Sequence, residues 1–307
     1  MSLFPRRAQD GLPLFPAYGQ YNRVYCVDSV NGSATADGLG WGRALNTIQA
    51  AVNKARYLPG TTTIDDTKDH SALVLVAPGH YNVAAGAGTL FSGYNIEIRG
   101  VGPAVPGKDY GVSINYDGAV TTTAVLGFSG SGITLRNLHI YCDAAIPALY
   151  IAGGDNNLIE NCVIECDGTN CTYGIQADSM KGSWIRDVVI RTPVTAGIYV
   201  AGGANHYAID GGIQRAKIYA AAAGAKGIYV ENTNTVYNFE ISDCKIDVEA
   251  AGATAKGIDN DATGNMIISE NKVVIETAAT AIESASHGVL HNYVSTNGTV
   301  TDPFDDD

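Results

Sequence analysis

Two columns of apolar residues recur along the chain from about residue 124 and predict its fold. The first column repeats at spacings of 24, 26, 28, 28 and 28 residues and consists of Ile140, Ile164, Ile190, Ile218, Ile246 and Val274. The second column drifts in the same way and consists of Leu149, Ile175, Ile198, Ile228, Ile258 and Ile282. Around both columns the alternation has the period of a strand and not the period of a helix. Two strand columns that share one drift predict a stacked coil, which is a β-solenoid.

The residues beside the first column predict where the coils bend and what fills them. Three positions before the column stand Asn137, Asn161, Asp187, Arg215, Asp243 and Asn271. Asn, Asp and Gly tolerate the left-handed backbone that such bends require. Four inward positions carry Cys142, Cys162, Cys166 and Cys244, which we expect to pack as small apolar side chains. Lys272 and Glu276 also fall on inward positions, which suggests that the core closes near the C-terminus.

The segment before the repeat predicts the opening of the solenoid. Val24, Tyr25 and Val27 alternate as a strand, and a long Gly/Asn/Asp turn follows them. ALNTIQAAVNKA, residues 44–55, places its apolar residues on one helical face. We expect this helix to cap the first coil and to cover strand edges that would otherwise be open to aggregation. Residues 71–83 read as a buried strand followed by a Pro-Gly turn.

Both ends of the chain differ in composition from the solenoid, which we expect to form one domain over residues 23–300. Residues 1–22 contain three prolines, which forbid a helix and favour an extended arm. The arm carries apolar residues that we expect to contact a partner, namely Leu3, Phe4, Leu12, Leu14 and Phe15. Residues 301–307 form an acidic tail.

Composition and charge narrow the function classes. Hydrophobic residues make up 46% of the chain and charged residues 16%, and the 36 glycines suit a solenoid with frequent turns. The net charge of −12 argues against a nucleic-acid partner, because phosphate contacts need a basic surface. No apolar run is long enough to span a membrane, and MSLFPRRAQDG leads into no apolar signal region. We therefore expect a protein that is made in the cytoplasm, with reduced thiols.

A resemblance supports the same fold. VYCVDSVNGSATADGLGWGRALNTIQAAVNKA, followed by LVLVAPGHYNV, resembles the opening segment of the pectin-lyase-like β-helix superfamily. The resemblance implies an all-β, right-handed parallel β-helix with three short strands per coil. That superfamily includes polysaccharide lyases, glycosidases, and phage and bacterial surface proteins without catalytic activity. The polygalacturonase-type motifs are missing here, and the nearest match to Gly-His-Gly is Gly79-His80-Tyr81, in the wrong region.

The outward positions of the first column do not predict a glycosidase site. Neighbouring coils are about 4.8 Å apart, so Glu165 and Asp247, three coils apart, would be separated by about 14 Å. A glycosidase carboxylate pair needs about 5–9.5 Å. Glu165 and Arg191 are expected to form a surface ion pair worth at most about 1 kcal/mol. His139 is expected to face outward, and the six histidines form no ligand set.

The second column is more promising, because its outward positions gather acidic and aromatic residues. Glu231, Asp259, Asp261 and Glu283 are expected on one face of adjacent coils. Carboxylates this close raise a pKa or bind a cation such as Ca²⁺, and the alternative is a solvated acidic patch. We expect no Arg or Lys near them to serve as a lyase base. Tyr150, Tyr199 and Tyr229 beside them are candidates for contact with a glycan or a subunit.

Three functions are compatible with these patterns. The first is a non-catalytic structural protein of a virus (phage) particle, a capsid-decorating cement protein or tail component held by its N-terminal arm. We expect such a protein to be located in the virion as a homo-oligomer, with a trimer favoured, and to have no catalytic residues, cofactor or metal. The second is a polysaccharide lyase or glycoside hydrolase of the tail-spike type, which would use the acidic residues of the second column. The third is a carbohydrate-binding adhesin.

Overall fold

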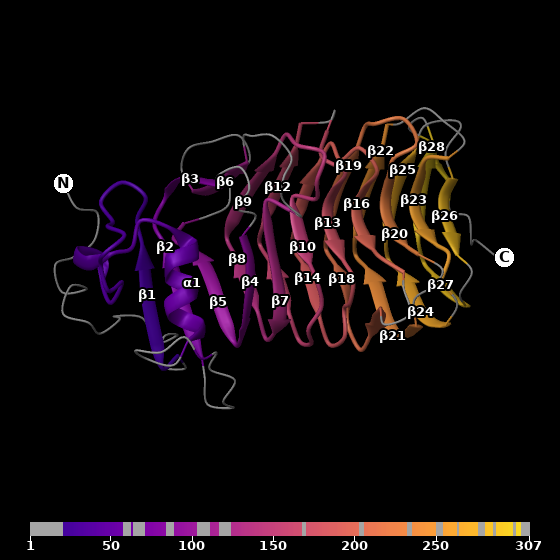
Figure 1. Cartoon of the computed structure of the whole chain (residues 1–307). Coiled ribbons are helices and arrows are strands. Elements are labelled where there is room, and N and C mark those ends of the chain that lie inside the picture. The colour runs from indigo at the N-terminus through magenta and orange to yellow at the C-terminus, as the bar shows by residue number, and fades with distance from the viewer. Residues whose placement is uncertain are drawn as a thin grey trace.

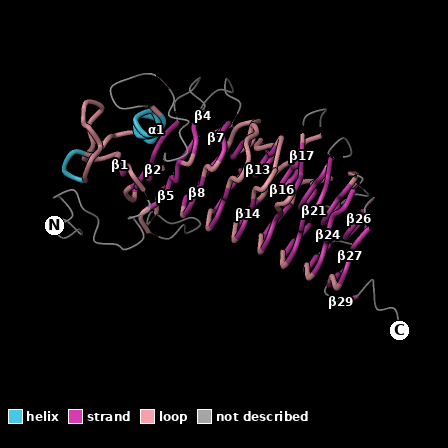
Figure 2. Tube along the Cα trace, turned by 90° about the horizontal axis from the view of Figure 1, so that it is seen from below, coloured by secondary structure: helices cyan, strands magenta, loops and turns pink. Residues whose placement is uncertain are grey.

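The chain folds as a parallel β-helix of three sheets. Its computed structural model describes residues 21–57, 63, 71–83, 89–102, 111–116, 124–167, 170–202, 206–231, 235–249, 254–262, 264–275, 280–284, 287–296 and 299–301. Figure 1 shows the coils stacked side by side along one axis, and Figure 2 shows the same row of coils from below. The expectation of an all-β parallel β-helix is confirmed.

Each full coil contributes one strand to each sheet, in the order sheet 1, sheet 2, sheet 3. Sheet 1 contains β1 (Arg23–Val27), β2 (Ala72–Val76), β5 (Ile96–Gly100), β8 (Thr134–Arg136), β11 (Leu158–Glu160), β14 (Trp184–Arg186), β17 (Tyr207–Ile209), β18 (Gly212–Gln214), β21 (Thr235–Ser242), β24 (Gly264–Ser269) and β27 (His287–Leu290). Sheet 2 contains β3 (Gly79–Val83), β6 (Val112–Tyr116), β9 (Leu138–Cys142), β12 (Val163–Cys166), β15 (Val189–Arg191), β19 (Lys217–Ala220), β22 (Lys245–Val248), β25 (Lys272–Ile275), β28 (Tyr293–Thr296) and β29 (Thr299–Thr301). Sheet 3 contains β4 (Thr89–Tyr94), β7 (Leu126–Ser131), β10 (Leu149–Ile151), β13 (Tyr173–Ala177), β16 (Ala196–Val200), β20 (Lys226–Val230), β23 (Lys256–Asn260) and β26 (Thr280–Ser284). All pairs are parallel except β28 with β29, where the chain reverses.

The strand register confirms the second column and corrects the end of the first. Every residue of the second column pairs with the next one along sheet 3. In sheet 2 the partner of Ile246 is Val273, and Val274 lies outward beside Asp247. The last spacing is therefore 27 residues, and assuming 28 shifted the assignment by one position. Consistently, the left-handed bend of this coil is at Glu270 (φ 57°) and not at Asn271.

With this correction, Lys272 no longer indicates that the core closes near the C-terminus. Lys272 is exposed on the outer face of sheet 2, while Val273 and Ile275 are buried. Glu276 lies outside the described residues. Among those residues the core runs without a break from Val27 to Val294.

Small residues let neighbouring layers approach closely inside the coils. Cys142, Cys162, Cys166 and Cys244 are free and buried, as their inward positions predict. Gly227, in β20, shows why glycine precedes the second column, because a Cβ atom there would lie 2.3 Å from Cγ2 of Ile246. The interior is therefore closely packed at this point.

Buried asparagines close the bends of the last coils. The Asn271 side chain accepts a hydrogen bond from the backbone N–H of Cys244 and donates to the carbonyl of Ile241, both at 2.9 Å. Asn292 lies one coil further on and accepts from the Nδ2 atom of Asn271 at 2.9 Å. Buried backbone N–H and C=O groups need hydrogen-bond partners, and these side-chain amides supply partners to backbone groups at the bends.

The helix predicted near the N-terminus is present. It is α1 (Ile48–Arg56), and a 3₁₀ turn, η3 (Trp41–Arg43), precedes it. The helix begins four residues later than expected, because Leu45 forms a bridge with Val27 and the Thr47 side chain caps the helix at the Ala50 N–H. The helix packs on β1, β2 and β4, and β4 is the edge strand of sheet 3 (Figures 1 and 2). It therefore covers a strand edge, as expected.

The expected arm falls almost wholly outside the described residues. Leu3, Phe4, Leu12, Leu14 and Phe15 lie there, and so does the tail beyond Thr301. Of the arm, the structure describes Tyr21 and Asn22, and Asn22 donates its backbone N–H to the Ser71 carbonyl at 3.1 Å. No described helix is long and apolar enough to cross a membrane.

Candidate functional site

The acidic residues of the second column lie on the outer face of sheet 3, as expected. Tyr229 pairs in register with Asp259, and Asp259 pairs with Glu283 on the next coil. Carboxylate oxygens of Asp259, Asp261 and Glu283 lie within 4.8 Å of one another. Glu231 lies one coil away and is held separately, so three of the four expected carboxylates form the cluster.

Two lysines neutralise this cluster, which corrects the expectation that no basic residue lies near it. Lys226 Nζ is 2.5 Å from Oδ2 of Asp259, and Lys256 Nζ is 2.7 Å from Oδ1 of the same carboxylate. Lys256 also contacts Oε2 of Glu283 at 3.0 Å. Both lysines stand two residues before the second column, where strict alternation would place them inward. The glycine after each lysine faces the core instead, Gly227 against Ile246 and Gly257 against Val273, so each lysine turns to the outer face. Asp259 is 0% exposed, so its charge is stabilised by the two ammonium groups and not by water.

This arrangement leaves little room for Ca²⁺. A calcium ion needs several carboxylate or carbonyl oxygens that it does not share with other cations. Here two ammonium groups already bind the Asp259 carboxylate, and one of them binds Glu283. The residues present therefore fit a closed ion-pair network better than a metal site.

Glu231 is held by hydrogen bonds beside a stack of tyrosines. Its Oε2 atom accepts from the Tyr199 hydroxyl at 2.6 Å and from the Gly202 N–H at 2.7 Å. The rings of Tyr199 and Tyr229 stack with centroids 5.4 Å apart, and Tyr173 stacks on Tyr199 at 4.5 Å. Tyr173 stands two residues before the second column, where alternation predicts an inward side chain, so its place in the stack was not predictable from the repeat.

The stack covers ring faces that a sugar would use. Tyr199 lies between Tyr173 and Tyr229, and Lys226 Nζ lies 3.3 Å from the centroid of the Tyr229 ring. Tyr150 stands apart and donates its hydroxyl to Asp178. Contact of Tyr150, Tyr199 and Tyr229 with a glycan or a subunit stays a prediction.

The electrostatics of the cluster hold its groups in fixed protonation states. Burial opposes the charged form of Lys256, but hydrogen bonds to Asp259 and Glu283 outweigh burial and raise its pKa. Burial, followed by the hydrogen bond to Glu231, raises the pKa of Tyr199. Burial and the nearby charges of Asp261 and Glu231 raise the pKa of Tyr229 to about 12. Lys256 is therefore cationic, and the phenols of Tyr199 and Tyr229 are neutral, near pH 7.

The outer face of sheet 2 carries an open groove of about 620 Å³. It is lined by Tyr141, Glu165, Cys166, Arg191, Thr192 and Tyr219. The expected ion pair is present, with Arg191 Nη1 3.5 Å from Oε1 of Glu165. The Arg191 side chain is half exposed, which fits the weak surface pair that the sequence predicts.

A chain of polar side chains adjoins the N-terminal end of this groove. Ser113, in β6, pairs in register with His139 in β9, and Glu165 lies on β12 of the next coil. His139 Nδ1 is 3.3 Å from Oγ of Ser113, and Nε2 is 2.9 Å from Oε2 of Glu165. His139 faces outward, as expected, yet it is buried, as is Ser113. Sequence reasoning did not bring these three together, although the 26-residue spacing of Ser113 and His139 matches the repeat.

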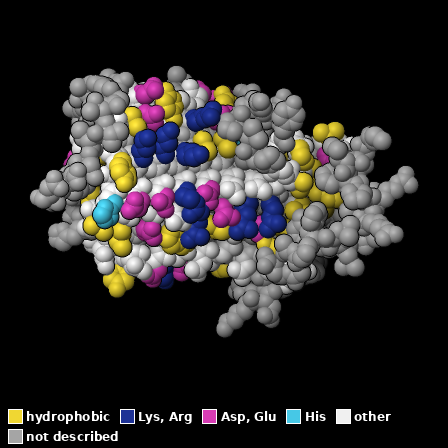
Figure 3. Space-filling model, turned by 180° about the vertical axis from the view of Figure 1, so that it is seen from behind, with side chains coloured by type: hydrophobic (Ala, Val, Ile, Leu, Met, Phe, Trp, Pro, Cys, Tyr) yellow, Lys and Arg dark blue, Asp and Glu magenta, His cyan; other side chains and the backbone are white. Residues whose placement is uncertain are grey.

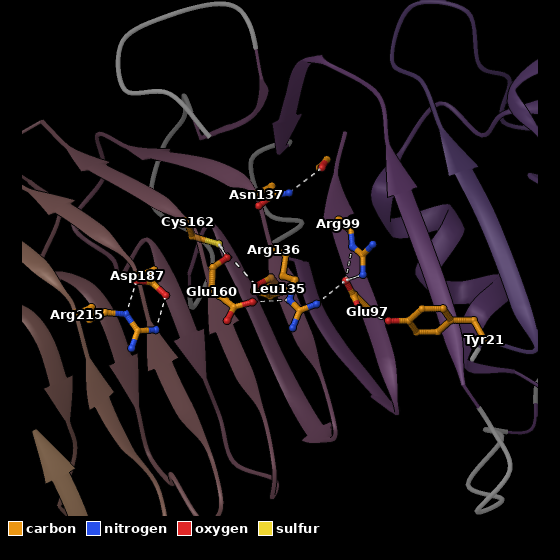
Figure 4. A network of polar contacts seen from close by, with 11 residues as sticks. Tyr21, Glu97, Arg99, Leu135, Arg136, Asn137, Glu160, Cys162, Asp187 and Arg215 are labelled. Atoms are coloured by element: carbon orange, nitrogen blue, oxygen red, sulfur yellow. Dashed lines mark hydrogen bonds and ion pairs between the residues drawn. The ribbon is translucent and has the colours of Figure 1, made fainter. Parts of the chain in front are cut away.

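Charged residues on sheet 1 and its bend are paired with one another. Arg136 Nε lies 2.8 Å from Oε2 of Glu160, and Arg136 Nη1 lies 3.7 Å from Oε1 of Glu97 (Figure 4). Arg215 donates two hydrogen bonds of 2.7 Å to Asp187, which hold the pKa of that carboxyl below its usual range. Figure 3 shows Asp and Glu side chains interspersed with Lys and Arg in one band on this side of the molecule, and a group of Lys and Arg side chains beside that band.

Comparison with known proteins shows which solved structures share this fold. No protein-family model matches the chain, and no curated protein does. Among solved structures it is similar to the pectin methylesterase PemA from Erwinia chrysanthemi, with 12% identity and a TM-score of 0.52 over 92% of this chain and 91% of that chain. A pectin methylesterase in complex with a hexasaccharide gives the same values. A rhamnogalacturonan lyase gives 12% identity and a TM-score of 0.50 over 83% of this chain and 70% of that chain. At this identity the likeness establishes a shared pectin-lyase-like fold.

Proposed function

We propose that this pectin-lyase-like β-helix is a structural component of a virus particle, held there by its N-terminal arm. In this proposal the outer face of sheet 3 is a stabilising surface and not the catalytic centre of a polysaccharide lyase or hydrolase. The role in a capsid or tail, the location in the virion and the trimeric state are parts of the proposal. They rest on the apolar, proline-rich arm and on the missing polygalacturonase-type motifs.

The observation that carries the proposal is the buried, charge-balanced Asp259. A general acid or base must reach its substrate within hydrogen-bonding distance. Asp259 is 0% exposed and is bound by Lys226 and Lys256, so it cannot meet a glycosidic bond without breaking both ion pairs. Glu231 is likewise bound by a phenol and a backbone amide. The face has the properties of a structural network.

Turnover of polysaccharides tests this proposal. The intact chain is incubated with a panel of acidic and neutral polysaccharides, and both absorbance at about 235 nm and new reducing ends are recorded. We expect no chain cleavage that depends on sheet 3. Cleavage by the unaltered chain that is lost in Asp261→Asn, but kept in the half-buried control Asp187→Asn on sheet 1's bend, would overturn it.

A second candidate function, glycan binding without cleavage, is favoured by the groove of sheet 2. This groove is lined by Tyr141, Tyr219 and the half-exposed Arg191. Aromatic side chains with a few polar groups are typical of ligand sites. Binding of an oligosaccharide panel, with Tyr219→Ala as the variant and Tyr237→Ala on sheet 1 as the control, tests it. Equal binding by both variants would contradict the groove as the site.

A further inference from the structure

We infer that Ser113, His139 and Glu165 form a nucleophile–base–carboxylate triad that hydrolyses a small acyl ester on the outer face of sheet 2. This inference goes beyond the structural role proposed above and does not depend on it. It also differs from cleavage of a polysaccharide backbone, because the bond broken is an ester.

The contacts around His139 match the roles of such a triad. The Glu165 carboxylate can only accept a hydrogen bond, so its contact of 2.9 Å with Nε2 places the imidazole proton on Nε2. The lone pair of Nδ1 then faces Oγ of Ser113 at 3.3 Å, and it can receive the hydroxyl proton once the hydroxyl turns away from Oδ1 of Asn115, to which it donates at 2.7 Å. Such a contact is often long in a free enzyme and shortens when substrate binds. A base between a hydroxyl and a carboxylate is the arrangement that recurs on unrelated folds.

The β-helix holds the three groups rigidly. They come from β6, β9 and β12, neighbouring strands of sheet 2, and Ser113 and His139 are direct partners across one ladder step. Ser113 and His139 are each 9% exposed, so packing restricts their rotamers. Sites built on regular strands position side chains more accurately than loops do.

Asn115 is the group best placed to assist. It lies two residues after Ser113 on the same outward face, and its Oδ1 atom accepts from the Ser113 hydroxyl at 2.7 Å. The Nδ2 atom of the same amide lies 3.3 Å from Nδ1 of His80. If the amide turns over, Nδ2 points toward Ser113 and can donate to an oxyanion that develops beside it.

The burial of the hydroxyl and the position of the groove define the substrate class. Since Ser113 is nearly closed, its ester must carry a short acyl group, such as acetyl. Tyr141 is the register partner of Asn115 and begins the groove that continues to Arg191 and Tyr219, so the alcohol part of the ester would lie along that groove. The substrate is therefore an acetyl-type ester of a larger, polar alcohol.

The reaction balances with water as the second reactant. Oγ of Ser113 attacks the carbonyl carbon, its proton moves to Nδ1 of His139, and the new C–O bond replaces the ester bond to the alcohol. The alcohol leaves with the proton from His139. Water then attacks the acyl group, gives one proton to Nδ1, and releases the acid as Ser113 recovers its proton.

Covalent labelling of the intact chain tests the nucleophile directly. The chain is treated with a fluorophosphonate, and the modified residue is located by mass spectrometry of its peptides. Labelling at Ser113 is expected, with loss of labelling in Ser113→Ala and unchanged labelling in Ser295→Ala, a serine that is similarly buried in β28 of sheet 2. If the folded, unaltered chain takes up no label at Ser113, the triad is refuted, whatever the variants do.

Hydrolysis of p-nitrophenyl acetate supplies the second readout. Each of Ser113→Ala and His139→Gln should lower the rate at least about 100-fold while thermal unfolding stays near that of the parent. Glu165→Gln should lower kcat, because it removes the negative charge that stabilises the imidazolium formed during the reaction. Ser295→Ala should keep the parent rate. A parent rate no higher than that of free imidazole, or equal rates in Ser113→Ala and the parent, would overturn the inference.

Discussion

Removing the charge of Asp259 tests how the outer face of sheet 3 is held together. In Asp259→Asn the buried carboxylate becomes a neutral amide, while both ammonium groups stay. Lys256 keeps Glu283 at 3.0 Å, whereas Lys226 keeps, among the residues that the structure describes, the face of the Tyr229 ring. The variant therefore leaves one lysine without its carboxylate in a largely buried position.

The contacts set the expected size of the effect. Removing one partner of a buried ion pair typically costs about 3–5 kcal/mol, because the other charge stays buried and unpaired. Lys226 and Lys256 are 20% and 17% exposed, so water still screens them in part. We therefore expect about 3 kcal/mol, at the lower end of that range.

Urea unfolding followed by far-UV circular dichroism measures this change. The double variant Asp259→Asn/Lys226→Met should recover at least half of the lost stability, because it removes the unpaired ammonium group as well. Asp187→Asn, which breaks a surface pair with Arg215, is the matched control and should change stability by less than about 1 kcal/mol. If Asp259→Asn costs no more than Asp187→Asn, the account of this face as an ion-pair network is wrong.

Three further predictions concern the core and the phenols. Gly227→Ala should lower the free energy of unfolding in urea by about 1–3 kcal/mol, because its methyl group collides with the neighbouring layer. Gly42→Ala has open space around the new methyl group and should change the free energy of unfolding little, and equal effects of the two variants would contradict the packing. Asn271→Ala should cost about 2–3 kcal/mol in the same assay, since it leaves a buried backbone N–H and a carbonyl without partners; a neutral result would mean that water replaces the amide. Burial raises the pKa of Tyr150 and Tyr229 to about 12, so the stability they contribute is complete below pH 10 and is lost as pH rises toward 12. The part of the phenolate absorbance near 295 nm that is lost in Tyr150→Phe and Tyr229→Phe should therefore appear above pH 10, and its full appearance at pH 10 in the folded chain would contradict this.

The repeat was predictable from sequence because a strand column leaves its period in every coil. The inward isoleucines and cysteines follow from alternation alone, and the register confirms them. The error at Val274 arose where one coil is a residue shorter, because a period of two turns any such slip into an exchange of faces.

The charge balance of the cluster was not predictable from alternation alone. Lys226 and Lys256 stand two residues before an isoleucine of the second column, where alternation predicts an inward side chain, and the inward glycine that follows each lysine turns it outward. The acidic residues follow the isoleucines and obey the alternation, so they were predictable without their partners. The burial of Asp259 was not predictable either, because it depends on the way in which long side chains from three coils fold over its carboxylate.

The triad was hidden for another reason. Ser113 lies before residue 124, where the repeat becomes regular, although Ile114 pairs with Ile140 and belongs to the first column. Its relation to Glu165 joins two coils diagonally, and sequence spacing alone does not show which of several polar residues meet. Distances between named atoms were needed to select His139 as the residue between them.

The most direct test of the proposed role is attachment to the particle. Purified intact chain and a chain lacking residues 1–22 are each added to virus particles that lack the native copy, and binding is measured by co-sedimentation. A chain lacking residues 302–307 serves as the control truncation. The account predicts that the intact chain and the control bind and that the armless chain stays in solution. Equal binding by the armless chain, or no binding by the intact chain, would contradict it.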